Sequence, residues 1–598
     1  MKSIPFRSIF LFLLLVLFGQ VAHSQSLSYG EQIDSAKKLY DAKDYKNAAV
    51  AYSRANRSVT DPDGDEVYNE ACSWALASEP DSAFAKLKGI VGVNFFKYSL
   101  LTTDQDLVTL RNDKRWMPLL DKIKKTRLQK LNQHKLYQEF DLIVSALKEA
   151  HTGLYWYNSK PVLDSICNTQ RGLITGVMNS LEFYNIVAPV IAFTKEGHTY
   201  TKLGDQALAY MKFSAKYFPI HIKFINNQPF IINDLQNIKT KGLVLTSING
   251  VSVGDIMKRF LSFEPSDGFN TTSKYRWIEE NGKFSSYYAY SFPMVDRFTI
   301  EAVEPSSGKK ITYSAIPSVT YASFYKSYRE TLSNIPNSTY TRPAILNLDT
   351  VTHTGILTFN SFSSDQYDAA KMEFHQFVKN AFSQIKKHGV RHLIIDIRNN
   401  GGGDEGFEDY LLSFLIAKDY TKYKYVQASA FSYSFYANSD YKKDWYKLEK
   451  MLKREHYLDK DGRILRKAGI EGHEPPQPDP FTGDIYILTS GLTYSGGSEF
   501  AALAKNYTKA VFIGEETGGG YYGNTSGNRI VLKLPYSKLQ IGIPLLKFVL
   551  DTPNDTIPFG HGVMPDYPVE GSITQYLRGD DVQLDFAKEL IKKNDRSK

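Results

Sequence analysis

The stretch from Asp484 to Gly520 constrains the fold more than any other part of this 598-residue chain. An apolar run, Ile485 to Leu488, leads into small residues at Ser495 to Gly497, and a helical pattern begins at Glu499. This order predicts a strand, a sharp turn and a helix, because glycines let the backbone turn tightly and approach other segments closely. Ser495 would then lie at the start of the helix, beside backbone N–H groups.

Ser495 has two interpretations at this stage. Serine often precedes a helix because its oxygen accepts a hydrogen bond from an otherwise unpaired backbone N–H, and the stretch taken alone favours this capping role. The second interpretation is a nucleophile exposed on a tight turn, for which the nearby N–H groups would stabilise negative charge. Other motifs in the sequence are needed to choose between the capping role and the nucleophile role.

Composition places the chain among ordinary globular proteins, with 42% hydrophobic and 23% charged residues. Its length suggests roughly three to four domains. The net charge of +8 is spread thinly, without a long Lys/Arg block or a nucleic-acid-binding motif. We therefore expect no nucleic-acid partner.

The first residues have the pattern of a signal peptide, residues 1–24. Lys2 and Arg7 precede an apolar run from Ile9 to Phe18, and Ala22 to Ser24 supplies small residues for cleavage. The run is short for a membrane span, which predicts export to a periplasm or the medium without stable membrane insertion.

The chain contains two cysteines, Cys72 and Cys167. This number excludes a disulfide scaffold and a cysteine-rich zinc site, and it leaves open whether the two form a pair.

The pattern of elements predicts a multidomain α+β chain. Alternating small and large residues at helical spacing favour a tetratricopeptide-like region or, equally, a plain helical bundle. The run Gly242 to Val253 has the strand, Asn-Gly turn and strand of part of a PDZ domain, although a generic β module fits as well. The expected ranges are 25–125 for the helical repeat region, 126–209 for a helical part that carries His198, 210–340 for the PDZ-like β region, 341–572 for an α/β core and 573–598 for a C-terminal helix.

The α/β core is expected from strands and helices that alternate after about residue 343. Ile356 to Phe359 and Arg391 to Ile397 have the pattern of strands, and Tyr367 to Lys387 that of an amphipathic helix. The segment from Tyr420 to Gly483 is polar and aromatic, which predicts an irregular insertion that shapes a cleft.

Two further stretches bear on Ser495. The run Ile394 to Gly403 ends in three glycines, whose N–H groups could face a developing oxyanion, whereas a simple tight turn needs only one or two. A serine nucleophile also needs a base. We choose His198 among the twelve histidines because Gly197 and Thr199 flank it in an extended segment, although an isolated histidine is more often a surface or core residue.

Four stretches, taken in order, resemble the carboxyl-terminal processing (tail-specific) protease family, in the branch with the tricorn core and histidine rather than lysine as base. They are Asp396 to Gly403, Ser495 to Glu499, Gly514 to Gly519 and Gly562 to Asp566. The resemblance covers roughly residues 139–569 and implies a peptidase core of the ClpP/crotonase-like type.

The resemblance also distinguishes two chemistries. One branch places a lysine 25 residues after the serine, and 495 + 25 = 520 is Gly520 here, so that base is absent. The resemblance therefore implies Ser495 as nucleophile, His198 as general base and the N–H groups of Gly402 and Gly496 as oxyanion hole.

A third catalytic residue is harder to assign. The tricorn protease supports its pair with a glutamate, and in this sequence Glu516 and Asp566 are the weak candidates for an acid that orients His198. The sequence has neither a His-Glu-x-x-His metal motif nor a phosphate-binding loop, so we expect no metal and no cofactor.

The leading hypothesis is an exported serine endopeptidase that cleaves unfolded or C-terminally exposed protein segments. The alternative is an inactive scaffold that binds peptides through the helical-repeat and PDZ-like modules. An α/β-hydrolase lipase or esterase is disfavoured, because Thr493 replaces the first glycine of Gly-x-Ser-x-Gly and the chosen histidine precedes the serine.

Overall fold

The structure is a computed structural model that describes residues 27–60, 62–235, 238–336, 342–470, 474–553 and 556–597. The expected signal peptide, residues 1–24, lies outside the described residues. The chain divides into two compact units, Met1–Ile123 and Lys124–Lys598. In the described ranges, no helix is both long and apolar enough to cross a membrane.

The first unit is helical. Each of the helices α2 to α5 packs against the next, and fully buried alanines such as Ala36, Ala48 and Ala83 let their backbones approach closely. Whether these helices form tetratricopeptide-type repeats stays a prediction. The helices are α2 (Tyr29–Asp41), α3 (Tyr45–Arg57), α4 (Gly64–Leu76), α5 (Pro80–Ile90), α6 (Tyr98–Thr103), the 3₁₀ helix η1 (Gln105–Leu110) and α7 (Trp116–Lys124).

The second unit begins with four helices and one short strand. Helix α10 is buried almost all round, since its apolar run leaves no polar face. The elements are α8 (Gln133–Ala150), α9 (Lys160–Gly172), α10 (Ser180–Ala192), β1 (Tyr200–Lys202) and α11 (Asp205–Phe213).

An antiparallel sheet follows, with strand order β2-β3-β4-β6-β7 and β5 beside β4. Along β6, Phe298, Ile300 and Ala302 are buried and alternate with more exposed residues, as expected for a sheet with one covered face. The PDZ-like assignment remains a prediction. The elements are β2 (Ile222–Ile225), β3 (Gln228–Ile231), β4 (Val244–Ile248), β5 (Val251–Ser252), α12 (Val253–Leu261), α13 (Thr272–Glu279), η2 (Glu280–Gly282), α14 (Lys283–Ser291), β6 (Arg297–Val303), β7 (Lys310–Pro317) and α15 (Tyr321–Ser333).

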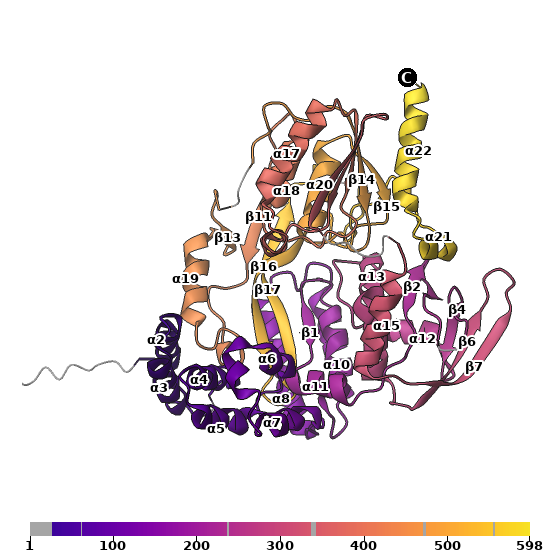
Figure 1. The fold of residues 1–598 in the computed structure, drawn as a ribbon. Coiled ribbons are helices and arrows are strands. Elements are labelled where there is room, and N and C mark those ends of the chain that lie inside the picture. Colours follow the sequence, from indigo (N-terminus) through magenta and orange to yellow (C-terminus); the bar gives the residue numbers. More distant parts are fainter. Residues whose placement is uncertain are drawn as a thin grey trace, which may run out of the picture. The chain divides into compact units, whose positions relative to one another are not determined.

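The α/β core contains a six-stranded sheet of order β18-β15-β14-β10-β9-β8, parallel except for β8. All five residues of β10 are buried, because helices cover both faces of the sheet. Figure 1 shows α17, α18 and α20 on one side and α22 on the other. The elements are β8 (Ala344–Asp349), β9 (Thr354–Phe359), α16 (Ser364–Ala369), α17 (Phe374–Lys387), β10 (His392–Asp396), α18 (Phe407–Ser413), β14 (Asp484–Thr489), α20 (Gly496–Tyr507), β15 (Val511–Gly514), β18 (Tyr567–Pro568), α21 (Ile573–Arg578) and α22 (Val582–Ser597).

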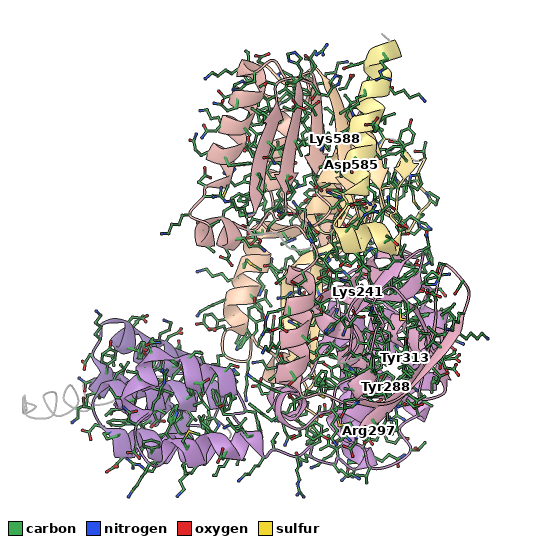
Figure 2. All side chains as sticks on the ribbon, turned by 45° about the vertical axis from the view of Figure 1, so that its right-hand side comes forward. Lys241, Tyr288, Arg297, Tyr313, Asp585 and Lys588 are labelled. Carbon is green, nitrogen blue, oxygen red and sulfur yellow. The ribbon has the colours of Figure 1, made fainter. Side chains whose placement is uncertain are left out.

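Helix α22 shows why the second face of this sheet is buried. Ala587 and Ile591 pack against Ile394 and other core residues. Asp585 and Lys588 lie on the exposed side of the helix, where Figure 2 labels them. The helix is therefore amphipathic, with its apolar stripe on the sheet.

A third sheet brings distant parts of the chain together. Its order is β1-β17-β11-β13-β12, and β16 also pairs with β17. The expectation of an irregular insertion from Tyr420 to Gly483 is wrong, because this segment contains β11, α19, β12 and β13 and supplies three strands to the sheet. The elements are β11 (Tyr423–Ala428), η3 (Tyr436–Asn438), α19 (Trp445–Glu455), β12 (His456–Leu458), β13 (Ile464–Arg466), β16 (Gly523–Lys533) and β17 (Gln540–Leu550).

Candidate active site

Ser495 lies on a strained turn between β14 and α20. Its φ of 51° and ψ of −127° put a non-glycine residue where backbone conformations are rare, which costs about 1–3 kcal/mol. The Ser495 side chain accepts no capping hydrogen bond from the helix. The capping interpretation is therefore not supported, and the half-buried hydroxyl stands directly before the N-terminus of α20.

Two glycine loops pack their backbones against this turn. A Cβ on Gly402 would lie 2.7 Å from Ser495 Cβ, and a Cβ on Gly519 would lie 3.2 Å from Ser495 N. Tyr494 N donates to Asn400 O (2.9 Å), and Gly518 N donates to Thr493 O (2.9 Å). These loops follow β10 and β15, so the serine sits at the carboxyl ends of parallel strands, where α/β sheets commonly bind ligands.

The third sheet positions His198 near the Ser495 turn. Strand β1 begins two residues after it and pairs antiparallel with β17, with Tyr200 opposite Gly542. The His198 ring lies 5.2 Å, centroid to centroid, from the ring of Tyr494, the residue before Ser495. Thr199 Oγ1 and His151 Nε2 are 2.7 Å apart in a buried pair, which anchors the segment on its other side.

The surroundings keep the His198 imidazole neutral. Burial lowers its pKa below the ordinary value, opposed by the negative charges of Asp267 and Glu499 and assisted by Arg529. A neutral imidazole is the form that a general base requires. In the part of the chain that the structure describes, however, neither the His198 ring nor the Ser495 hydroxyl makes a hydrogen bond, and His198 Nδ1 is buried without a partner.

The two expected oxyanion donors differ in availability. Gly496 is the first residue of α20, so its N–H has no acceptor within the helix. The expectation for Gly402 is not met in this conformation, because its N–H donates to the side-chain oxygen of Asn400 (2.9 Å). Among the described residues, the N–H of the neighbouring Gly403 has no acceptor.

Neither expected acid orients His198. Glu516 Oε1 accepts hydrogen bonds from His561 Nδ1 (3.0 Å) and Gly562 N (2.9 Å). Asp566 pairs with Lys505 and accepts the N–H of Phe512. Both carboxylates are thus engaged elsewhere, and their assignment to His198 is wrong for this structure.

Asp267, which no motif in the sequence marks, is a carboxylate that connects several parts of the site. It is 1% exposed and accepts hydrogen bonds from Gly197 N (2.9 Å), Tyr494 Oη (2.7 Å) and Gly520 N (3.0 Å). Only an acid followed by a glycine marks it in the sequence, and this is too common a pair to select it.

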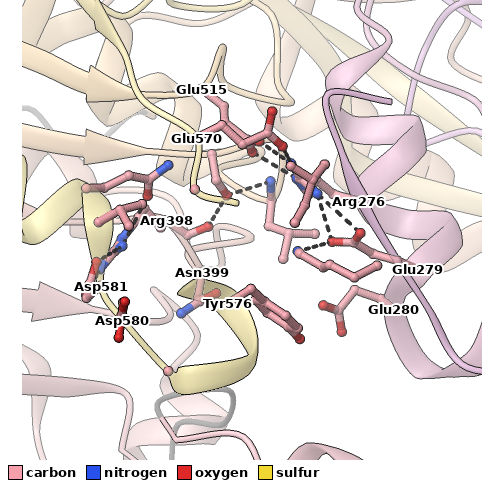
Figure 3. Close-up of a pocket in the computed structure, with 18 of the residues that line it drawn as sticks. Arg276, Glu279, Glu280, Arg398, Asn399, Glu515, Glu570, Tyr576, Asp580 and Asp581 are labelled. Carbon is pink, nitrogen blue, oxygen red and sulfur yellow. Dashed lines mark hydrogen bonds and ion pairs between the residues drawn. The ribbon is translucent and has the colours of Figure 1, made fainter. Parts of the chain in front are cut away.

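One pocket of about 290 Å³ lies near the site but is separate from it. Neither Ser495 nor His198 lines it. Figure 3 shows Arg276 reaching Glu279, Glu515 and Glu570 there, so its walls are largely ion-paired. We read it as a structural junction between α13 and the loops of the core.

Metal-like spacing occurs in the described residues at Cys72, Asp104 and Asp106, in the first unit. There the hydroxyls of Tyr68 and Tyr40 already donate to the two carboxylates. This arrangement accounts for the carboxylates without a metal ion.

Part of the chain is similar to proteins of known families. The family model described as Peptidase family S41 matches residues 353–569. A tricorn-like protease C-terminal subunit from Sulfurisphaera tokodaii is 31% identical over 146 residues, which are 24% of this chain and 16% of that protein. This chain therefore spans only a small part of the length of that relative.

Solved structures share the fold. Mature CPAF complexed with lactacystin has a TM-score of 0.51 at 12% identity and covers 77% of this chain and 98% of its own. Mature CPAF has a TM-score of 0.50, also at 12% identity, and covers 77% of this chain and 97% of its own. Residues 353–569 of this chain are therefore similar to peptidase family S41.

Proposed function

We propose that the protein is a serine peptidase in which Ser495 forms an acyl-enzyme and His198 is the general base. The observation that carries this proposal is the strained turn at Ser495. Two glycine-rich loops pack closely against this turn, and the neutral His198 lies beside it. Strain that the surrounding structure maintains is typical of functional turns. The match of residues 353–569 to the model of peptidase family S41 supports the same reaction class.

In this mechanism Ser495 Oγ attacks the carbonyl carbon of a peptide bond while its proton passes to His198. The N–H of Gly496, joined by Gly403 or by a released Gly402, stabilises the negative oxygen of the tetrahedral intermediate. His198 then gives the proton to the leaving amine, and the C–N bond breaks. Water, activated in turn by His198, hydrolyses the acyl-enzyme and regenerates the serine.

Substrate class follows from the resemblance of the sequence to tail-specific proteases. We infer that the protein is exported and acts on peptides or unfolded protein segments, including exposed C-termini. The PDZ-like and helical-repeat regions would then supply the surfaces that bind such segments by adding a strand or filling a groove.

The direct test compares wild type with Ser495→Ala on an unfolded casein. We expect the variant to lose roughly 10³-fold or more of kcat, and a fluorophosphonate to label Ser495 in the wild type. Ser364→Ala changes an exposed serine on α16 and should leave both measurements unchanged. Equal turnover by wild type and Ser495→Ala would exclude the nucleophile assignment.

A non-catalytic peptide-binding scaffold is the second candidate function. It is favoured by the missing hydrogen bond between Ser495 and His198 and by the unpartnered Nδ1 of His198. This function predicts that peptide binding survives Ser495→Ala and that no covalent probe labels Ser495. Calorimetric titration with unfolded peptides, run beside the labelling experiment, separates the two functions.

A further inference from the structure

Asp267 connects three functional stretches that are far apart in the sequence. It lies between α12 and α13, with its carboxylate buried. Its Oδ1 accepts the N–H of Gly197, next to His198, and the hydroxyl of Tyr494, next to Ser495. Its Oδ2 accepts the N–H of Gly520, at the end of the glycine loop after β15.

These contacts explain why a buried charge is tolerated here. An ionised carboxylate is costly to remove from water unless donors replace its hydration, and three donors do so at 2.7 to 3.0 Å. Hydrogen bonds to an ionised acceptor are roughly twice as strong as neutral ones. Asp267 is therefore held firmly, and it holds its three partners firmly in turn.

The glycine before His198 is part of the same arrangement. A Cβ on Gly197 would lie 1.6 Å from Tyr494 Oη, so any side chain there would displace the tyrosine. Because Gly197 has none, the Tyr494 hydroxyl and the Gly197 N–H can share one carboxylate oxygen. The histidine segment and the serine turn thereby approach each other without intervening atoms.

The residues after Asp267 fix it to the rest of the site. Gly268 N donates to Lys195 O (2.9 Å), Phe269 N donates to Gly560 O (2.7 Å), and the Asn270 side chain donates to Thr517 O (2.6 Å). Residues 267–270 thus connect the segment that carries His198 to the loops that contain Thr517 and Gly560. Because residues 267–270 are hydrogen-bonded at several places, they can set the position of the His198 ring without contacting it.

We propose that Asp267 is the positioning residue of the site, and that it aligns His198 with Ser495 through Gly197 and Tyr494 rather than by a bond to the imidazole. This proposal rests on the proposed peptidase function. It assigns the supporting carboxylate, which Glu516 and Asp566 do not supply, to a loop outside the region matched by the family model.

Glu196 is the competing carboxyl group, and it does not fit the role. It is fully buried, it accepts Thr525 N (3.1 Å) with one oxygen, and its other oxygen has no partner among the described residues. Burial, and after it the nearby charge of Asp267, raise the pKa of Glu196 well above its ordinary value, which favours the neutral form of this carboxyl group. Asp267, which accepts three hydrogen bonds, is therefore the carboxyl group that fits the role.

The charge of Asp267 gives the proposal a specific signature. The charged groups that act on His198 are Asp267 and Glu499, which raise its pKa, and Arg529, which lowers it. Asp267→Asn removes one of the two opposing charges, so the pKa of His198 should fall further below its ordinary value. A residue with a purely structural role would not move this titration.

The experiment compares wild type, Asp267→Asn and Tyr494→Phe. For Asp267→Asn we expect kcat on unfolded casein to fall about 10- to 100-fold with a smaller change in KM, as for misplaced catalytic groups. The acid limb of its kcat/KM profile should move to lower pH. Tyr494→Phe removes a hydrogen bond but keeps the charge of Asp267. It should therefore lower kcat about 3- to 10-fold and leave the acid limb of the kcat/KM profile at the wild-type pH.

The titration of His198 can also be measured by a method that does not depend on enzymatic activity. The rate at which diethyl pyrocarbonate modifies His198, followed by mass spectrometry against pH, reports its neutral fraction in each variant. The exposed His375 on α17 is the internal control and should be modified at the same rate in all three proteins. This readout keeps the proposal testable even if Ser495→Ala shows that the protein does not catalyse hydrolysis.

The outcomes separate the two proposals. If Ser495→Ala retains full activity, the proposed function fails, and the proposal for Asp267 still stands or falls on the modification rates. An unchanged His198 titration in Asp267→Asn, with unchanged kcat, would overturn the positioning role. If Asp267→Asn does not fold, a Tyr494→Phe variant with wild-type kcat would overturn it instead.

Discussion

Lys422 is a single cation among three buried carboxylates beneath the serine turn. It pairs with Glu408, Asp409 and Glu499, and all four residues are at most 5% exposed. One positive charge cannot balance three negative ones, and burial raises the pKa of Glu408 to about 7. Glu408 Oε2 has no hydrogen-bond partner in the described residues and would lie 3.5 Å from a Cβ on Gly496.

Lys422→Met should therefore destabilise the protein strongly. The variant leaves the carboxylates buried without their cation, which lowers the free energy of unfolding by about 3–5 kcal/mol in comparable cases. Urea denaturation followed by tryptophan fluorescence measures the change. Adding Glu408→Gln to this variant should recover part of the loss. Lys379→Met, on the exposed face of α17, is the control and should stay within about 0.5 kcal/mol of wild type.

At the residue scale, the sequence predicts groups that carry a local pattern. Ser495 stands out because glycines surround it, and His198 because small residues flank it. Asp267, Lys422 and His151 carry no such pattern, since their roles come from partners that are far away in the sequence. Glu516 and Asp566 were wrongly assigned to His198 for the same reason. Both lie close to a motif along the chain, but this closeness does not predict which side chain each carboxylate contacts in the fold.

At the element scale, the parallel strands of the α/β core were predictable and the antiparallel third sheet was not. Strands such as β10 and β14 are continuous apolar runs, as expected where helices cover both faces. The third sheet joins β1, near residue 200, to β17, near residue 540, and its strands β12 and β13 are only three residues long each. Pairing over such separations leaves no local periodicity in the sequence.

The glycine loop after β10 gives an element-scale prediction with a built-in control. Gly402 has a φ of +89°, and a Cβ there would lie 2.6 Å from Gly496 N and 2.7 Å from Ser495 Cβ. Gly402→Ala should displace the serine turn and lower kcat about 100-fold. Gly401 has open space around its Cβ position, so Gly401→Ala should remain within about threefold of wild type. Similar activity in both variants would contradict the packing of this loop against Ser495.

At the scale of the whole molecule, the chain consists of two compact units with separate cores. The first packs helices around residues such as Ile33 and Tyr52, and the core of the second begins with α8. Between α7 and α8, residues 126–130 form neither helix nor strand. Such connecting segments open at little cost in free energy, whereas a helix in a packed unit must first unfold.

Limited proteolysis tests this division. Lys125, Arg127 and Lys130 are exposed in or next to the connecting segment, so dilute trypsin should cut there first and release two resistant fragments. Lys386 and Lys387 are equally exposed but lie at the end of α17, and they should be cut much later because their backbone is helical. Changing Lys125, Arg127 and Lys130 to glutamine should remove the early cut without changing the thermal unfolding of either unit. Early cleavage elsewhere, at the same rate in wild type and in the triple variant, would show that the boundary between the units is not the weakest point of the chain.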